Sequence, residues 1–307
     1  MKKIIEVENF AKSYGEVKAV RDISFYVEEG KLFSFLGPNG AGKSTTIDTL
    51  CTLLDFEMGK ITIDGFDLRK QAQAIRQSIG VVFQDSVLDA LLTVRENLLI
   101  RAGLYSQSNS EIKRMVDGVT RAIELADFIN RPYGKLSGGQ RRRADIAAAL
   151  LHKPKILFLD EPTTGLDPQT RLAVWETVKR LQAEYGMTVF LTTHYMEEAT
   201  DSDFIIVIDH GQIAAKGTPQ ELKTQYSSDS LRLVPNNEEA GGEIQKQLIA
   251  MKMEYGISGG TITVKLPDTM ASTAILENCK TYIASFQVLQ GSMDDAFIGI
   301  TGKGIRQ

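Results

Sequence analysis

One stretch decides the fold of this 307-residue chain: Gly37-Pro38-Asn39-Gly40-Ala41-Gly42-Lys43-Ser44-Thr45. It fits the pattern G-x-x-x-x-G-K-[ST], a glycine-rich loop that cradles nucleotide phosphates. The apolar residues 31–36 predict a buried strand before the loop, and residues 44–54 predict a helix after it. This order surrounds an anion with backbone N–H groups and the positive end of a helix. We expect Lys43 to reach the β- and γ-phosphates and Ser44 to place its hydroxyl on Mg²⁺.

Composition limits the functions that this chain can have. The formal net charge of -4 argues against broad nucleic-acid binding, so we expect no nucleic-acid partner. No apolar run reaches the ~18 residues of a membrane span, and the first residues lack the apolar region of a signal peptide. The two cysteines, Cys51 and Cys279, have no metal-ligand spacing and suggest no disulfide framework. We therefore expect a cytoplasmic protein that serves any membrane process through another chain.

The order of apolar runs predicts an α/β fold in two domains, residues 1–226 and 227–307. Short strands come first, at Ile4–Phe10, Val17–Val20 and Ile23–Val27, and predict an antiparallel sheet beside a nucleotide core. Strands then alternate with helices, which is typical of a parallel sheet. A helical subdomain is expected at about residues 85–135, with a helix capped by Ser110. After a linker at residues 227–230, a strand-helix-strand-helix-strand order predicts a small accessory α+β domain.

A second motif follows the apolar strand Ile156–Asp160, where Asp160 is joined by Glu161. Asp160 is expected to hold Mg²⁺ through its hydration shell, and Glu161 to polarise the attacking water as general base. Two carboxylates at a strand end are also common as surface charge. The glycine-rich loop upstream favours the catalytic interpretation.

A third motif is Leu136-Ser137-Gly138-Gly139-Gln140, at the start of a helix predicted over residues 140–151. A hydroxyl, bare N–H groups and a helix dipole predict a second anion site. The alternative is an ordinary helix cap provided by Ser137. Capping alone does not explain two consecutive glycines, which weaken a helix.

Together these motifs resemble the nucleotide-binding subunit of ABC transporters over residues 4 to about 220. The resemblance implies a P-loop NTPase core with an antiparallel β subdomain, an α-helical insertion and the C-terminal accessory domain. It implies ATP and Mg²⁺, with four catalytic residues: Glu161, His194, Lys43 and Gln84. It assigns the metal to Ser44, Gln84 and Asp160. It assigns nucleotide contacts to Tyr14, Gly37, Pro38, Asn39, Gly40, Ala41, Gly42, Lys43, Ser44, Thr45, Ser137, Gly138, Gly139, Gln140 and Asp167.

The same resemblance implies a dimer, in which the glycine-rich loop of one subunit faces Ser137 of the other across ATP. Residues 165–171 and the tail 292–302 look like the daunorubicin-resistance type of exporter ATPase. That type binds a separate ABC-2-type permease, a membrane protein that holds the ATPase on the inner face of the membrane. Its cargoes are drugs, lipids or polysaccharides. The alternatives are an importer ATPase and a soluble ABC ATPase. A single cassette, without a long coiled coil, disfavours the soluble alternative.

Three remaining features have plain interpretations. Arg141–Arg143 are interpreted as a solvated helix face rather than a nucleic-acid contact. His152 and His210 are interpreted as surface residues. Residues 84–105 are the expected coupling surface, where Val87, Leu88, Leu91 and Leu92 form either a groove for a permease helix or the insertion's own core.

Overall fold

The computed structural model describes residues 2–302 of the 307. Internal contacts divide the chain into two compact units, Met1–Thr218 and Pro219–Gln307. The helix that starts at Pro219 packs against the last helix of the chain within the second unit, so this division falls slightly before the boundary expected after Tyr226. The expected domain boundary stays a prediction.

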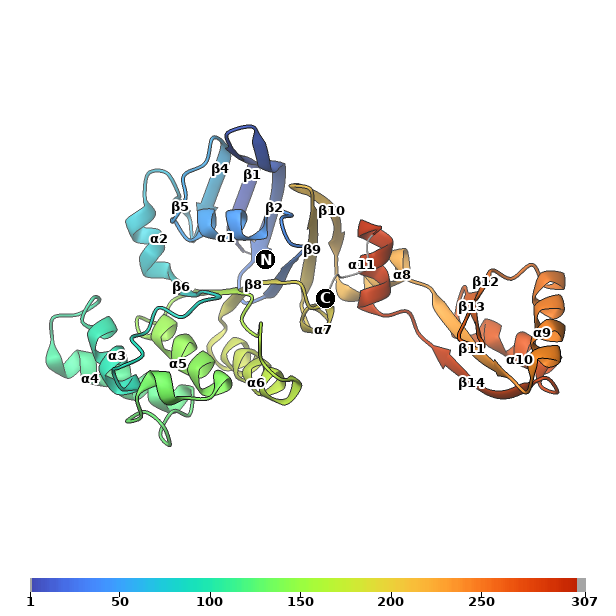
Figure 1. Ribbon diagram of the computed structural model, residues 1–307. Helices are drawn as coiled ribbons and strands as arrows, with labels where there is room; N and C mark the ends of the chain where they lie inside the picture. The colour runs from blue at the N-terminus through green and yellow to red at the C-terminus, as the bar shows by residue number, and fades with distance from the viewer. Residues whose placement is uncertain (1, 303–307) are drawn as a thin grey trace. The chain divides into compact units, whose positions relative to one another are not determined.

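A six-stranded sheet forms the centre of the first unit (Figure 1). Its strands in spatial order are β10 (Gln212–Gly217), β9 (Phe204–Asp209), β3 (Leu32–Leu36), β8 (Thr188–Thr193), β7 (Ile156–Asp160) and β6 (Ile79–Val82). All neighbours are parallel except β10, which forms a hairpin with β9. Strands β3, β7 and β8 are buried along almost their whole length because both faces of this sheet are covered. The expected α/β core is confirmed.

Successive side chains of these strands enter two different cores. Leu32, Leu157 and Leu191 pack into the core shared with α5 (Gly138–Leu150) and α6 (Pro168–Tyr185). The intervening phenylalanines pack into the opposite core, which includes α1 (Lys43–Leu50). There the ring centroids of Phe33 and Phe158 lie 5.1 and 5.3 Å from that of Phe190. The strands that end at the site are therefore fixed on both faces.

The expected antiparallel subdomain is a second sheet. Its strands in spatial order are β2 (Val17–Glu28), β1 (Lys3–Tyr14), β4 (Met58–Ile63) and β5 (Phe66–Asp67). The prediction of two strands between residues 17 and 27 was wrong, because β2 is continuous. An irregularity in the pairing accommodates left-handed residues on both strands, Asn9 at φ 50° and Asp22 at φ 53°, which are joined by a 2.9 Å hydrogen bond from Asn9 Nδ2 to Asp22 Oδ1.

The helical insertion follows β6, as expected. The helices not yet named in the first unit are α2 (Ala72–Ser78), α3 (Val94–Ala102), α4 (Asn109–Ala122), the 3-10 helix η1 (Tyr133–Lys135) and α7 (Met196–Ala199). The expected cap at Ser110 was wrong, since α4 begins after Ser108 and Ser110 lies in its first turn. Across residues 2–302, no helix combines the length and hydrophobicity needed to cross a bilayer.

The second unit contains a four-stranded antiparallel sheet. Its strands in spatial order are β12 (Tyr255–Ser258), β13 (Thr261–Leu266), β11 (Asp229–Pro235) and β14 (Ile283–Leu289). Leucines and valines of β11 and β13 form a core with α9 (Glu238–Ala250) and α10 (Ser272–Cys279), which follows the 3-10 helix η2 (Thr269–Ala271). The accessory α+β domain is confirmed. Strand β12 was missed because it is short and mostly exposed.

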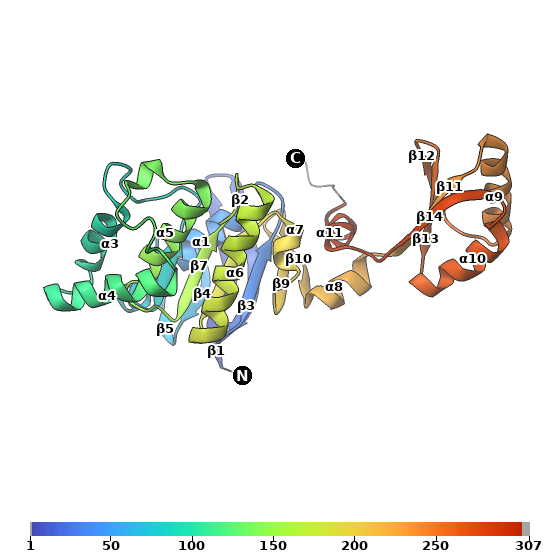
Figure 2. The ribbon, with the colours of Figure 1, turned by 90° about the horizontal axis from the view of Figure 1, so that it is seen from below.

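Two helices complete the second unit, α8 (Pro219–Tyr226) and α11 (Met293–Thr301), and they lie side by side (Figures 1 and 2). A capping box between Ser292 and Asp295 starts α11. A Cβ atom on Gly299 would lie 2.3 Å from the carbonyl oxygen of Tyr226, so only glycine permits this approach. The tail used for the family resemblance is thus a helix packed on α8.

Candidate nucleotide-binding and catalytic site

The glycine-rich loop joins the end of β3 to the start of α1. Gly42 precedes the first helical residue with a φ of 108°. A Cβ atom on Gly42 would lie 2.6 Å from the carbonyl oxygen of Ala19, and one on Gly37 would lie 2.3 Å from that of Ile208. Both positions therefore require a residue without a side chain. The predicted strand, loop and helix are all present, and the N–H groups of the first helical turn have no helical partners of their own.

Lys43 is the first residue of α1, and its side chain is only 5% exposed. Its Nζ donates to the carbonyl oxygens of Gly37 at 2.8 Å and Pro38 at 3.2 Å, so the lysine folds back onto its own loop. The same Nζ lies 3.7 Å from Glu161 Oε1. Burial lowers the pKa of Lys43, and the nearby carboxylates of Glu161 and Asp160 oppose that shift. The carbonyl oxygens of Gly37 and Pro38 thus accept the hydrogen bonds that Lys43 Nζ could donate to a bound phosphate.

The end of β7 places the two acidic residues beside β8. The Thr192 hydroxyl donates to Asp160 Oδ1, and burial raises the pKa of the Asp160 carboxyl. The Glu161 N–H donates to the carbonyl oxygen of Thr192 at 3.0 Å. Glu161 has a φ of 43°, a left-handed conformation that costs energy for a non-glycine residue and is typical of functional sites. Thr192 was not among the expected site residues, since a threonine inside an apolar strand gives no sequence signal.

Glu161 is the centre of a small polar cluster. Its Oε2 lies 3.3 Å from Nδ1 of His194 and accepts a 3.2 Å hydrogen bond from the Thr164 hydroxyl. Its Oε1 faces Lys43, as described above. One carboxylate therefore lies between a lysine from the glycine-rich loop and a histidine from the end of β8. The cluster thus brings an acid, a lysine and a histidine together beside the glycine-rich loop.

The strand order explains how distant motifs meet. The glycine-rich loop follows β3, Asp160 ends β7, and His194 follows β8, so all three lie at the carboxyl edge of one parallel sheet. Gln84 lies just beyond β6 at the same edge, with an exposed side chain. Tyr14 ends β1 and is 48% exposed, with Lys12 Nζ 5.4 Å from its ring centroid. The ring is half exposed, and the Lys12 ammonium lies over it.

The predicted second anion site begins helix α5. Ser137 is the N-cap, and it forms a capping box with Gln140: the Gln140 N–H donates to Ser137 Oγ at 3.3 Å and the Ser137 N–H donates to Gln140 Oε1 at 3.1 Å. Ser137 therefore acts as the cap of helix α5 in this structure. Within residues 2–302, no hydrogen bond or ion pair joins residues 137–140 to the glycine-rich loop.

Packing explains why two glycines follow Ser137. A Cβ atom on Gly138 would lie 2.7 Å from Leu166 Cδ2, and one on Gly139 would lie 2.5 Å from Thr170 Cγ2. Leu166 precedes Asp167, which is the N-cap of α6 and accepts from the Thr170 N–H at 3.0 Å. The start of α5 thus lies directly against the start of α6, and both glycines are needed for that contact.

The interpretation of Arg141–Arg143 as a solvated face was wrong for its middle member. Arg142 is 7% exposed, and its guanidinium donates to the carbonyl oxygens of Phe83 at 2.7 Å and Gln84 at 3.2 Å. Its Nη1 also lies 4.0 Å from Asp145 Oδ2. A basic triplet on a helix gives no sign of which member is buried. Arg142 links the helix of the second anion site to the backbone of Gln84.

The interpretation of His152 as a surface residue was also wrong. Its ring stacks on Tyr105 with centroids 4.2 Å apart, and Nε2 lies 2.9 Å from the carbonyl oxygen of Ile79. Burial lowers the pKa of His152. His210 is exposed in the turn between β9 and β10, as expected.

The expected coupling surface divides into two roles. Leu88 is buried in the insertion, whereas Val87 and Leu91 are 56% and 88% exposed. Part of the leucine-rich segment is therefore core, and part is an apolar surface just beyond Gln84.

The metal assignment fits the chemistry of the donors. Mg²⁺ prefers oxygen ligands and usually retains waters while it binds one or two carboxylates and substrate phosphates. Ser44 and Gln84 offer neutral oxygens and Asp160 a carboxylate. No cluster of three or more His, Cys, Asp or Glu side chains able to hold a metal occurs among residues 2–302. The oxygen donors of Ser44, Gln84 and Asp160 suit Mg²⁺.

Fold and site together define a P-loop ATPase. Residues 20–164 match the family described as ABC transporter, and residues 217–301 match the C-terminal domain of the DrrA1-3-like ATP-binding proteins. The chain is 37% identical to the daunorubicin/doxorubicin resistance ATP-binding protein DrrA of Streptomyces peucetius, over 97% of this chain and 92% of the relative. It is 35% identical to the Nod factor export ATP-binding protein I of Burkholderia orbicola, over 97% of both chains.

Among solved structures, the chain resembles the dimeric post-hydrolysis state of the ATP-binding cassette MJ0796 bound to ADP and Pi. The TM-score is 0.63 at 30% identity, over 70% of this chain and 98% of the cassette. The chain belongs to the ABC transporter ATP-binding family, and its second unit carries the DrrA-like C-terminal domain. It is an ATP-binding, ATP-hydrolysing subunit of ABC type.

Proposed function

We propose that this ATPase hydrolyses ATP at two composite sites of a homodimer and thereby drives export of a drug, lipid or other amphipathic compound through a separate ABC-2-type permease. One observation carries the catalytic part of the proposal. Glu161 is held between Lys43 and His194, at 3.7 and 3.3 Å, beside a loop built for phosphate.

The side chains divide the work by their chemistry. Lys43 leaves its loop carbonyls for the β- and γ-phosphates, where its charge offsets that of the transferring group. Glu161 accepts a proton from the attacking water, and His194 fixes the carboxylate and contacts the γ-phosphate. Mg²⁺, held by Ser44, Gln84 and Asp160, would neutralise charge that develops between the phosphates. Tyr14, whose side chain is half exposed, stacks on the adenine.

The absence of hydrogen bonds or ion pairs between the two predicted anion sites, within residues 2–302 of one chain, supports the proposed dimer. The capping box of Ser137 and Gln140 leaves the remaining N–H groups of the first turn of α5 free for an anion. We propose that Ser137, Gly138, Gly139 and Gln140 bind the phosphates held by the partner subunit's loop, with Asp167 near the junction. ADP and phosphate no longer bridge the two halves after hydrolysis, so the dimer opens.

The names of the relatives and an apolar surface beyond Gln84 support a permease partner. The matched relatives are named for daunorubicin/doxorubicin resistance and for Nod factor export. The exposed Val87 and Leu91, just beyond Gln84, offer an apolar contact for a permease helix. The protein would then lie in the cytoplasm, bound through the permease to the inner face of the membrane.

The general-base assignment is tested with Glu161→Gln. This variant should bind ATP, lose at least ~100-fold in phosphate release and accumulate a closed dimer in analytical ultracentrifugation. Glu176→Gln, an exposed glutamate of α6, is the matched control and should keep full turnover. Unchanged ATP turnover in Glu161→Gln would contradict the general-base role of Glu161.

The export direction is tested by purifying the protein from membranes with its partner. An integral membrane partner without a solute-binding protein supports export. A companion solute-binding protein in the complex would instead favour an importer ATPase.

A further inference from the structure

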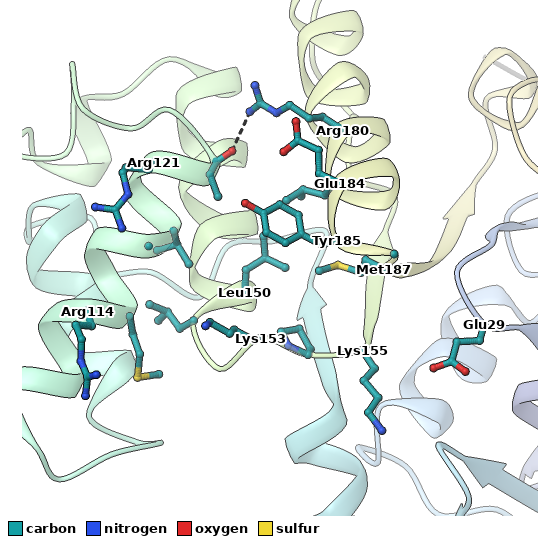
Figure 3. A pocket seen from close by; sticks show the side chains of 18 residues that line it. Glu29, Arg114, Arg121, Leu150, Lys153, Lys155, Arg180, Glu184, Tyr185 and Met187 are labelled. Carbon is teal, nitrogen blue, oxygen red and sulfur yellow. Dashed lines mark hydrogen bonds between the residues drawn. The ribbon is translucent and has the colours of Figure 1, made fainter.

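A cavity of about 850 Å³ lies away from the nucleotide site, in the same unit (Figure 3). Its walls include Lys155, which precedes β7, and Met187, which precedes β8. It therefore opens at the amino edge of the parallel sheet, whereas the nucleotide site occupies the carboxyl edge. Its volume falls in the ~300–1,000 Å³ range of small-molecule sites. Nothing in the proposed ATPase function uses it.

The floor and the rim of this cavity differ in character. Leu150, Leu181 and Met187 are buried side chains that form an apolar floor, with Val119 from helix α4. The rim carries five cations, which are Arg114, Arg121, Lys153, Lys155 and Arg180, and two acids, Glu29 and Glu184. Figure 3 shows Arg114 and Arg121 on one side and Glu184 with Tyr185 on the facing helix α6.

Part of that charge is already neutralised. Lys155 pairs with Asp64 at 2.8 Å, and Arg180 pairs with Glu124 and donates to the carbonyl oxygen of Ala122. Among residues 2–302, by contrast, no ion pair or hydrogen bond involves the side chains of Arg114, Arg121 or Lys153. Three cations thus surround an apolar floor without acidic partners.

One residue of the cavity wall is a glycine inside a helix. Gly118 lies inside α4, where glycine weakens a helix relative to alanine. A Cβ atom there would meet nothing within 4 Å, so neither packing nor backbone twist requires glycine. Gly118 lines the cavity. The absence of a side chain at Gly118 leaves room beside Met115 and Val119. Packing within the fold does not explain why this residue is a glycine.

We propose that this cavity binds a small amphipathic anion. Its acidic group would pair with Arg114, Arg121 and Lys153, and its apolar body would cover the floor made by Leu150, Leu181 and Met187. Such a ligand would join α4 of the helical insertion to α6 of the core. It would bind without contact to ATP, because the two sites lie at opposite edges of the sheet.

The test is a fluorescence titration of the full chain with 1-anilinonaphthalene-8-sulfonate, beside its uncharged counterpart N-phenyl-1-naphthylamine. We expect saturable binding of one sulfonate probe per chain, unchanged by saturating ADP. The double variant Arg114→Gln/Arg121→Gln should bind the sulfonate probe about tenfold more weakly than wild type. Its affinity for the uncharged probe should fall by less than about twofold. Gly118→Leu places an apolar side chain in the wall of the cavity and should weaken binding of both probes.

Two controls keep the result interpretable. Lys113→Gln removes an exposed cation of α4 outside the cavity and should bind both probes as wild type does. Gly118→Leu raises helix propensity, so its thermal unfolding midpoint should not fall. Unchanged binding in Gly118→Leu, equal weakening of both probes in the double variant, or displacement of the sulfonate probe by ADP would each overturn the proposal.

Discussion

The guanidinium of Arg142 donates a 2.7 Å hydrogen bond to the carbonyl oxygen of Phe83, the residue that separates β6 from Gln84. A second bond, at 3.2 Å, reaches the carbonyl oxygen of Gln84 itself. Helix α5, whose N-cap is Ser137, therefore holds the backbone of Gln84 in place. Asp145 on the same helix accepts from the Ser86 hydroxyl at 2.6 Å and extends the attachment. These bonds connect the start of α5 to the segment that follows β6.

Arg142→Lys should break this attachment without removing the charge. A lysine ammonium cannot reproduce the planar fork that contacts two carbonyls at once. We expect a loss of about 2 kcal/mol in the free energy of unfolding and a fall in ATP turnover, since leaving buried carbonyls without a donor is costly. Urea denaturation and phosphate release measure the two effects. Arg143→Lys, on the same helix, is the control and should change both little.

Gly139→Ala should destabilise the chain by about 1–3 kcal/mol, because its Cβ would lie 2.5 Å from Thr170 Cγ2. Thr170→Ser removes that methyl group, so the double variant should recover most of the lost stability in urea denaturation. If the double variant is no more stable than Gly139→Ala alone, the contact with α6 does not explain the glycine. ATP turnover of the stable double variant then reports separately on phosphate binding.

His152 should make the first unit sensitive to mild acid. Its Nδ1 is buried without a hydrogen-bond partner, and burial lowers the pKa of the ring in the folded state. The unfolded chain therefore binds the proton more readily, so this stabilisation is present above about pH 6.5 and is lost as the pH falls toward the lower folded pKa. His152→Gln keeps a donor for the Ile79 carbonyl and should flatten the pH dependence between about pH 7 and 5. An identical slope in denaturation curves of both proteins would contradict the assignment.

Gly299→Ala should separate α11 from α8 in the second unit. Its Cβ would lie 2.3 Å from the carbonyl oxygen of Tyr226, a backbone atom that cannot rotate away, so we expect a loss of about 1–3 kcal/mol. Gly242→Ala in α9 is the matched control. No atom lies within 4 Å of its Cβ position, so it should stabilise the chain by about 0.5–1 kcal/mol. Equal effects of the two substitutions in urea denaturation would contradict the packing argument.

Most of the fold was predictable because its signals are local. The runs around β3, β7 and β8 are mostly apolar, and a fixed glycine motif marks the start of α1. The predicted strand boundaries were wrong where strand pairing is irregular or where the strand has few buried apolar residues. Asp22 lies between the two strands expected at Val17–Val20 and Ile23–Val27, but it forms part of a bulge in the continuous strand β2. Strand β12 pairs with β13 although its side chains are mostly exposed.

The sequence by itself determined that this chain has a phosphate loop, two acidic residues at a strand end and a second helix start rich in glycine. Those features depend on residue types at short spacing, which fix backbone conformation and donor chemistry. Only the tertiary structure decided that Arg142 is buried, that Thr192 holds Asp160, and that Gly138 and Gly139 lie against α6. These are contacts between segments far apart in the chain, and they depend on which face of each helix and strand meets its neighbour.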